Sequence, residues 1–392
     1  MARVWALLSS REGDNAQVLA VAEALKCPYE TRRFQNRPGA IVANLLFGPS
    51  LPGMVTHPSG DFGPPWPDLV IAAGTQSEPI CAQIRRATQQ AGHSTRQVFL
   101  GRPWIDPARY DLVVTTPQYW VPPGPNVMEI DLPLHRVTAE RIAPERDRWS
   151  QRLAELPAPY FTVLLGGSIS SYTFDSRAAK RLALEASALA SAAGGSLLVC
   201  GSYRTPSQVM KAMVENIHVP ARIFEWRQSR QENPYLALLG LAREIIVTGD
   251  SMTMLAEACA TGKPVHIFDL GEGRYAMRDG APQGNPVIVH HPWLMSALRA
   301  RAKHHKVSLT NGILPLRLHR DTRNIHRKLI QSGRAVWLGD AFPSARVPRA
   351  GSDVTAVAAR IQSLISDTAA FPATDDLPAS GLSASALAAD RS

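Results

Sequence analysis

Residues 244–268 read EIIVTGDSMTMLAEACATGKPVHIF and contain a strand, a helix and a second strand in succession. The β-branched run at the start predicts a buried strand that ends at Thr248, because such runs are typical of parallel sheets. Small and apolar residues over 254–260 predict a helix that Gly262 ends, and an apolar strand follows over 264–268. This succession indicates a parallel βαβ unit.

The same alternation extends outward from this unit toward both ends of the chain. Apolar segments that predict further strands lie at 4–8, 68–72, 97–100, 111–115, 160–165, 196–200 and 221–226. Helical patterns separate many of them, as in the Ala- and Leu-rich segment 178–193, which Gly194 ends. The sequence therefore predicts an α/β protein that contains two doubly wound, Rossmann-like domains.

The predicted domain boundary follows a charged helical segment, where two prolines interrupt the helix. The N-terminal domain is expected over 1–156 and the C-terminal domain over 157–320. The final segment, 365–392, is rich in Ala, Ser, Thr, Asp and Pro and is predicted to be disordered.

Composition narrows the class of partner and compartment. The formal net charge of +9 draws the protein toward anions. No run of five or more like charges occurs, so nucleic acid is not expected as a partner. Peripheral contact with an anionic membrane is expected. The four cysteines form no CxxC pair, and no apolar run is long enough to span a bilayer. We expect a cytoplasmic protein, including the inner face of a membrane.

Ligands of open parallel sheets bind at the carboxyl ends of the strands, so the loops that follow the predicted strands hold the candidate residues. The predicted binding residues of two such loops are Gly166, Gly167, Ser168, Ser202, Arg204 and Thr205. Paired glycines suit backbone contact with a diphosphate, and Arg204 would supply a fixed positive charge. A simple glycine turn is the alternative interpretation of the first loop.

The loop after Thr248 combines several groups that suit a nucleotide. Its predicted binding residues are Gly249, Asp250, Ser251, Thr253 and Glu257. Hydroxyls and free amides at the start of a helix hold phosphate oxygens, and Glu257 can accept hydrogen bonds from a ribose diol. The alternative is that Asp250 or Ser251 caps the helix and Glu257 complements its dipole. The combination within one loop favours binding.

The first strand is followed by Gly13-Asp14-Asn15. Asp14 is the candidate general base, and an N-cap role is the alternative. No metal site is predicted, because adjacent residues of a strand, such as His290 and His291, point to opposite faces.

With these motifs in place, the chain resembles the mitochondrial-fission Elm-type family, which has plant and many bacterial members. The matching motifs are Gly13-Asp14-Asn15-x-Gln17, Pro125-Asn126-Val127, Gly166-Gly167, Ser202-x-Arg204-Thr205-Pro206, Asn233-Pro234-Tyr235-Leu236, Val247-Thr248-Gly249-Asp250-Ser251-Met252, Glu257-Ala258 and Thr261-Gly262-Lys263-Pro264-Val265. They follow the family's order, and the Gly249 motif is the most specific. The first loop matches less well, since such members often carry a longer glycine-rich segment there.

The family is similar in fold to the two-Rossmann-domain (GT-B) glycosyltransferases, whose domains face each other across a cleft. In those enzymes the C-terminal domain holds the nucleotide of the sugar donor. The resemblance implies that Ser251 and Thr253 meet the diphosphate and that Glu257 meets the ribose. It also implies an N-terminal domain that faces the acceptor, and a helix within 321–345 that crosses back to that domain.

Three functions follow as hypotheses. The leading one is a glycosyltransferase that takes a nucleotide-diphosphate sugar as substrate, uses no cofactor, and acts on an acceptor of the cell envelope. Asp14 would deprotonate the acceptor hydroxyl. The first alternative is a non-catalytic adaptor, as the plant members are known as fission factors that recruit a dynamin-related GTPase. It would bind protein partners or an anionic membrane surface. The second alternative is a nucleotide-sugar epimerase.

Overall fold

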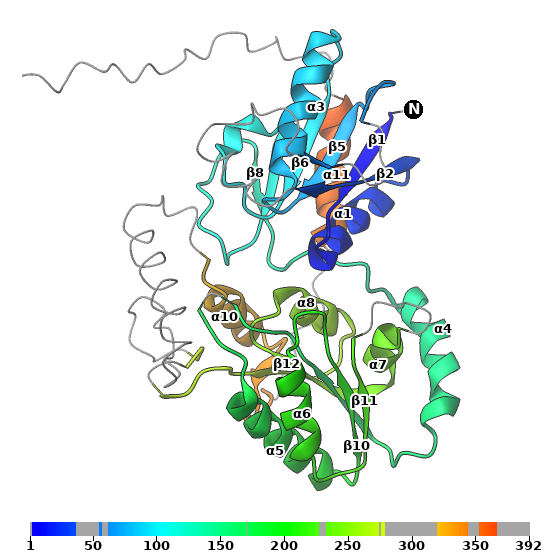
Figure 1. Ribbon diagram of the computed structural model, residues 1–392, viewed down its shortest axis with the longest axis vertical. Coiled ribbons are helices and arrows are strands. Elements are labelled where there is room, and N and C mark those ends of the chain that lie inside the picture. Colours follow the sequence, from blue (N-terminus) through cyan, green and yellow to red (C-terminus); the bar gives the residue numbers. More distant parts are fainter. Residues whose placement is uncertain are drawn as a thin grey trace, which may run out of the picture.

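The computed structural model describes residues 2–36, 55–56, 62–169, 171–226, 233–273, 276–278, 320–343 and 353–366. The described chain forms two domains, each built on a six-stranded sheet (Figure 1). Apart from residues 365 and 366, the segment predicted to be disordered lies outside the described residues.

The N-terminal sheet has the strand order β2-β1-β5-β6-β7-β8, and every pairing is parallel. Its strands are β1 (Val4–Leu8), β2 (Tyr29–Arg33), β5 (Leu69–Ala73), β6 (Arg96–Leu100), β7 (Leu112–Thr115) and β8 (Val127–Glu129). A short antiparallel pair, β3 (Gln35–Asn36) and β4 (Val55–Thr56), stands apart from it. In β1, Val4 and Ala6 belong to one apolar cluster and Trp5 to another, so both faces of the sheet are buried.

Helices cover the two faces of this sheet. The helix α1 (Glu12–Ala24) supplies Val18 and Val21 to the first cluster, and α3 (Glu78–Gln90) supplies Ile80 and Ile84 to the second. Alternate residues of a strand point to opposite faces, so helices on both sides explain why the central strands β1 and β5 are apolar throughout.

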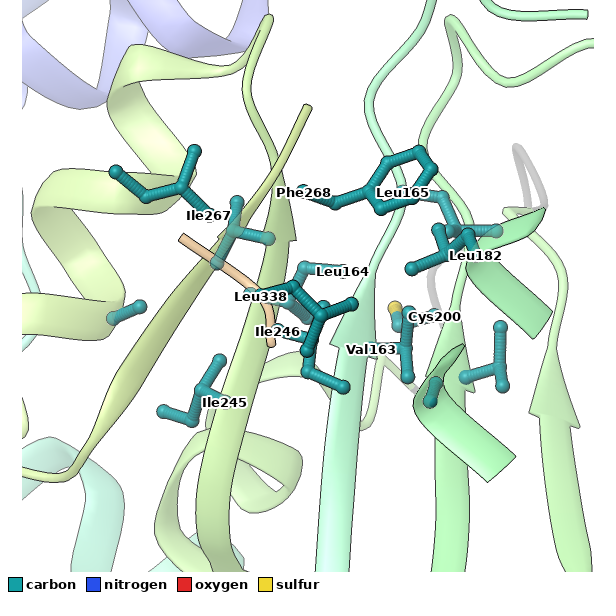
Figure 2. Packing of buried hydrophobic residues seen from close by; sticks show 14 of the residues in the cluster. Val163, Leu164, Leu165, Leu182, Cys200, Ile245, Ile246, Ile267, Phe268 and Leu338 are labelled. Carbon is teal, nitrogen blue, oxygen red and sulfur yellow. The ribbon is translucent and has the colours of Figure 1, made fainter. Parts of the chain in front are cut away.

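The C-terminal sheet has the order β11-β10-β9-β12-β13-β14 and is also parallel throughout. Its strands are β9 (Tyr160–Leu164), β10 (Ser196–Cys200), β11 (Ala221–Phe224), β12 (Ala242–Thr248), β13 (Val265–Phe268) and β14 (Val336–Trp337). The helices α5 (Ser176–Ala192), α6 (Ser207–Glu215), α7 (Tyr235–Leu241) and α8 (Met252–Ala260) alternate with them. Figure 2 shows Val163, Ile246 and Phe268 in its core. The predicted fold class, an α/β protein with two doubly wound domains, is confirmed.

The strand orders fix where a ligand can bind. In the first sheet the chain runs from β1 outward to β2 and then returns to β5 on the other side. The second sheet repeats this, with β9 followed by β10 and β11 on one side and by β12 on the other. Such topological switch points open a crevice at the carboxyl ends of the two central strands. The loops after β1, β5, β9 and β12 are therefore the candidate positions.

The helix α4 (Ala139–Ser150) packs against the C-terminal domain, although the predicted boundary at residue 156 assigns it to the first. Ile142 lies against the second domain's core. A Cβ atom added at Gly240 of α7 would lie 2.6 Å from Ile142 Cγ2 and 3.0 Å from Arg146 Cβ. Glycine thus permits the close approach of the two helices.

We expect Gly240→Ala to lower the free energy of unfolding by roughly 1 kcal/mol, because overpacking costs about 1–3 kcal/mol and the better helix propensity of alanine returns at most about 1. Urea unfolding followed by circular dichroism measures the change. The control is Gly124→Ala, whose Cβ would meet no atom closer than 3.4 Å. Equal stability of the two variants would contradict the expectation.

The helix that returns to the N-terminal domain is α11 (Asp353–Ser366), which Figure 1 shows in orange beside α1. Its residues Val357 and Ile361 belong to the first domain's core. The segment 321–345, expected to cross back, contacts the first domain through polar groups: Asn324 Nδ2 donates to the Pro117 carbonyl oxygen over 3.0 Å, and Lys328 Nζ lies 3.2 Å from Asp131 Oδ1. The helix found there, α10 (Arg323–Gln331), buries Ile325 and Leu329 in the second domain. Its apolar stripe is used by that core and cannot also serve the first.

None of the helices in the described ranges is long and apolar enough to cross a membrane.

Candidate functional site

The two switch points meet at the junction of the domains. A Cβ atom added at Gly13, in the first turn of α1, would lie 3.5 Å from Thr253 Oγ1 in the first turn of α8. The N-terminal ends of these two helices, one from each domain, therefore abut. Because α1 begins at Glu12, Asp14 lies inside the helix rather than in the loop that the sequence predicts.

Asp14 lies against the backbone of the neighbouring switch-point loop. Gly74 has a φ of +71°, and a Cβ atom added there would fall 2.2 Å from Asp14 Oδ2. This oxygen is buried and accepts no hydrogen bond from any residue that the structure describes. Burial raises the pKa of the Asp14 carboxyl, and the charges of Arg11 and Arg320 oppose the rise. A carboxyl in such surroundings is poised to take a proton.

The next residue of the same motif has a structural task. Ser9 N–H donates to Asn15 Oδ1 over 2.9 Å, and Asn15 Nδ2 donates back to the Ser9 carbonyl over 2.9 Å. Asn15 is buried, and this reciprocal pair ties the start of α1 to the end of β1. The position of Asp14 is thereby fixed.

A buried hydrogen-bond network joins the loops after β9, β10 and β12. Gly167 N–H donates to Asp250 Oδ2 over 2.9 Å, and Thr248 Oγ1 donates to Asp250 Oδ1 over 2.7 Å. Arg204 Nη2 lies 2.8 Å from the same Asp250 Oδ2. Arg204 was predicted to offer its charge to a diphosphate. In the structure its charge is balanced by a fully buried carboxylate, and its contact with a diphosphate stays a prediction.

The glycines of the first loop are required by this network. A Cβ atom added at Gly166 would lie 2.3 Å from Asp250 Oδ2, and one added at Gly167 would lie 2.4 Å from the Arg204 carbonyl oxygen. Gly166 and Gly167 are both buried. The close approach that they permit is to the protein itself, which favours the structural alternative for these two residues.

Hydroxyl groups of the same loops also bind the backbone. Thr205 Oγ1 lies 2.7 Å from the Gly166 carbonyl oxygen, and Ser202 Oγ lies 3.3 Å from it. Ser168, whose side chain is exposed, accepts a hydrogen bond from Phe174 N–H over 2.9 Å. These residues are brought together as predicted, but their printed contacts stabilise the loops.

The start of α8 is the part of the predicted site that remains suited to a ligand. Ser251 occupies the N-cap and forms no side-chain capping hydrogen bond. Thr253 is half-buried and faces Gly13 across the junction. Amides at the first turn of a helix carry partial positive charge and attract anions.

Glu257 lies one turn further along α8 and accepts a hydrogen bond from the Tyr235 hydroxyl, with 2.5 Å between the oxygens. Burial raises the pKa of Glu257 to about 7, and the hydrogen bond from Tyr235 works in the opposite direction. The carboxyl therefore changes charge near neutral pH. Tyr235 belongs to the Asn233-Pro234-Tyr235-Leu236 motif. The motif is visible in the sequence, but its contact with Glu257 is not.

His326 of α10 is a second residue that sequence reasoning missed. Its Nε2 donates to the Gly249 carbonyl oxygen over 2.8 Å, and burial lowers the pKa of His326 to about 4, so the ring is neutral near pH 7. A Cβ atom added at Gly249 would lie 2.7 Å from Met277 Sδ. The loop before α8 is thus packed against both His326 and Met277. A lone buried histidine carries no sequence signal for such a role.

No set of three or more His, Cys, Asp or Glu side chains within the described ranges is arranged to hold a metal ion.

The family model described as "Mitochondrial fission ELM1" matches residues 12–280, which include the switch-point loops of both domains. The chain belongs to this family. The ELM1 match extends from the start of α1 through β13, and so contains Asp14 as well as the Asp250 network.

Two relatives of this ELM1 family member are similar in sequence to parts of the chain. The mitochondrial fission protein ELM1 of Arabidopsis thaliana is 26% identical over 223 residues, which are 51% of each chain. An uncharacterized protein of Rickettsia prowazekii is 29% identical over 110 residues, 28% of this chain and 31% of that one. The matched regions thus span about half or less of these relatives.

Similar solved structures include an epimerase and a glycosyl transferase. The UDP-GlcNAc 2-epimerase of Neisseria meningitidis, bound to UDP-GlcNAc, is 11% identical, with coverages of 93% and 100% and a TM-score of 0.46. A family 9 glycosyl transferase of Veillonella parvula is 10% identical, with coverages of 84% and 96% and a TM-score of 0.40. These scores are low, so the fold assignment rests on the chain's own two sheets.

Proposed function

We propose that this protein is a glycosyltransferase that takes its sugar from a nucleotide-diphosphate donor bound by the C-terminal domain. The observation that carries the proposal is the buried, unpartnered Oδ2 of Asp14, held where the two switch points meet. Sugar transfer to a hydroxyl needs a base for the hydroxyl proton, and a carboxyl with a raised pKa suits that task.

Residues of the second domain would hold the donor. The first-turn amides of α8, together with Ser251 and Thr253, would bind the diphosphate and stabilise it as the leaving group. Glu257 would accept hydrogen bonds from the ribose diol, as acidic residues do in dinucleotide folds. A helix N-terminus supplies positive potential, so this arrangement needs no metal ion.

Thermal stability against a panel of nucleoside diphosphates tests the donor site. A ligand that binds only the folded protein at 100 times its Kd adds about 2.7 kcal/mol to stability. We expect a rise in Tm with one nucleotide for the wild type and a smaller rise for Glu257→Ala. The matched control is Glu272→Ala, an exposed glutamate outside the proposed donor residues. If no nucleotide raises Tm, the proposed donor site is wrong.

The raised pKa of Glu257 makes a prediction about pH. An ionised carboxylate accepts both hydroxyls of a ribose diol, so the affinity for the nucleotide should rise as pH increases through about 7 and then level off. Glu257→Gln, which cannot ionise, should flatten the profile. Isothermal titration calorimetry between pH 5.5 and 8.5, taken as an approximate working range around that pKa, measures both curves. A wild-type affinity that falls with rising pH would contradict the assignment.

A non-catalytic adaptor is the second candidate, and one observation favours it. Arg204 and Asp250 neutralise each other within the loop network, as they would in a scaffold that has no substrate. Transfer assays separate the candidates. An adaptor forms no product, a transferase forms product only with an acceptor, and an epimerase converts the donor without one.

A further inference from the structure

Basic side chains from both domains gather around Tyr119, in the loop after β7. The Cζ atom of Arg102, from the loop after β6, lies 5.2 Å from the centre of the Tyr119 ring. The Cζ atom of Arg320, just before α10, lies 6.0 Å from it. Arg320 also pairs with Tyr119 through a backbone bridge, and its Nε donates to Gln118 Oε1 over 2.9 Å. Its position relative to the first domain is therefore fixed.

The charges of these arginines act on one another and on Asp14. Burial lowers the pKa of Arg102, and the nearby charge of Arg320 lowers it further. Arg320 and Arg11 are also the two cations that act on Asp14. Arg11 is exposed at the N-cap of α1, after β1, so it lies at the same carboxyl edge of the first sheet as the loops that hold Arg102 and Tyr119. The three arginines therefore share this edge with Asp14, whose pKa is raised by burial.

The nearby acid Glu78 is already engaged by the backbone. Its carboxylate oxygens accept hydrogen bonds from Trp104 N–H over 2.9 Å and Ile105 N–H over 3.0 Å. The local balance is therefore positive. A guanidinium presents a planar fork that matches phosphate oxygens, and several cations together favour a ligand with more than one negative charge. A phosphate monoester, with about −1.5 to −2 charges at pH 7, fits better than a single carboxylate.

We infer that Arg11, Arg102 and Arg320 form an anion subsite for the phosphate monoester group of the acceptor. The identification of the ligand as the acceptor rests on the proposed function. A phosphate bound there would place the rest of the acceptor, with its hydroxyl, next to the Asp14 carboxyl. The nucleotide of the donor would lie on the other side of the junction, against α8.

A phosphate monoester can come from a soluble metabolite or from a lipid headgroup, and two probes distinguish these sources. Glycerol 3-phosphate represents the first, and vesicles that contain phosphatidic acid represent the second. Vesicles with phosphatidylglycerol, a diester, control for general attraction to an anionic surface. Binding to either phosphomonoester probe supports the subsite and identifies its source.

The test uses the full chain and titrates these probes into wild type, Arg320→Gln and Arg11→Gln. We expect each substitution to weaken binding of the phosphomonoester about tenfold or more, because a hydrogen bond to a charged group contributes about 1.5–3 kcal/mol. The control is Arg222→Gln, an exposed arginine on β11, which should leave binding unchanged. Circular dichroism checks that every variant is folded.

Several results would overturn the inference. Neither probe binds, or Arg320→Gln and Arg222→Gln bind equally well, or a nucleoside diphosphate displaces glycerol 3-phosphate competitively. The last result would mean that the arginines belong to the donor site. If glycerol 3-phosphate binds in an Arg320-dependent way and no nucleotide binds at all, the anion subsite stands and the glycosyltransferase proposal fails.

Discussion

Replacing Asp14 by asparagine is expected to lower the turnover number roughly 100- to 10,000-fold, which is the usual contribution of a positioned general base. Asparagine keeps the shape of the side chain against Gly74 but cannot take a proton from the acceptor. Donor affinity should change little, because Asp14 lies in the first domain. Steady-state kinetics with saturating donor measure the effect, and nucleotide titration checks the binding.

The same variant should be as stable as the wild type, or more stable at high pH. The folded-state pKa of Asp14 is raised, so ionisation in the folded protein is disfavoured and stability is lost as pH rises through that pKa. The neutral amide of the Asp14→Asn variant removes this loss. The control Glu12→Gln lies in the same helical turn but is exposed, and its turnover should stay near that of the wild type. Full turnover in Asp14→Asn would exclude Asp14 as the base.

Asp250→Ala is expected to destabilise the C-terminal domain by about 3–5 kcal/mol, as the loss of one partner of a buried ion pair does. Arg204 would keep a half-buried charge without its carboxylate, and Gly167 N–H would lose its acceptor. The cavity left beside the glycines adds to the cost. Urea unfolding, followed by a probe in the second domain, measures the loss.

Two further variants separate the ion pair from general damage. Asp340→Ala removes the partner of Arg278 from an exposed pair with a 3.0 Å contact and should cost less than about 1 kcal/mol. The double variant Asp250→Ala/Arg204→Met should recover part of the stability, since no unpaired charge remains. A double variant that is less stable than Asp250→Ala would show that the pairing is not the source of the effect.

The sequence was sufficient for the central strands because their apolar runs are unbroken. β1 and β10 have the predicted bounds. Of the edge strands, β11 was predicted, whereas β2 and β14 escaped prediction for a physical reason. β2 reads YETRR and is largely exposed, while β14 is only two residues long. An edge strand is buried on fewer sides, so its sequence carries little of the apolar signal.

The site was predictable as a set of loops but not as a set of contacts. The switch-point rule correctly gathers Ser202, Arg204 and Asp250, because parallel strands end at one edge. Which side chains pair depends on their rotamers and on the conformations of separate loops. Neither leaves a periodic pattern in the sequence. The pairing of Arg204 with Asp250 and the contact between Tyr235 and Glu257 are of this kind.

The return of α11 to the first domain affects the order in which the chain folds during synthesis. Domains usually fold as units from the N-terminus onward. Here the N-terminal core lacks Val357 and Ile361 until residues beyond 361 have left the ribosome, while the second domain's described core ends at Leu338. The second domain can therefore complete its described core first, and the apolar side of the first domain that α11 will cover stays exposed in the nascent protein until then.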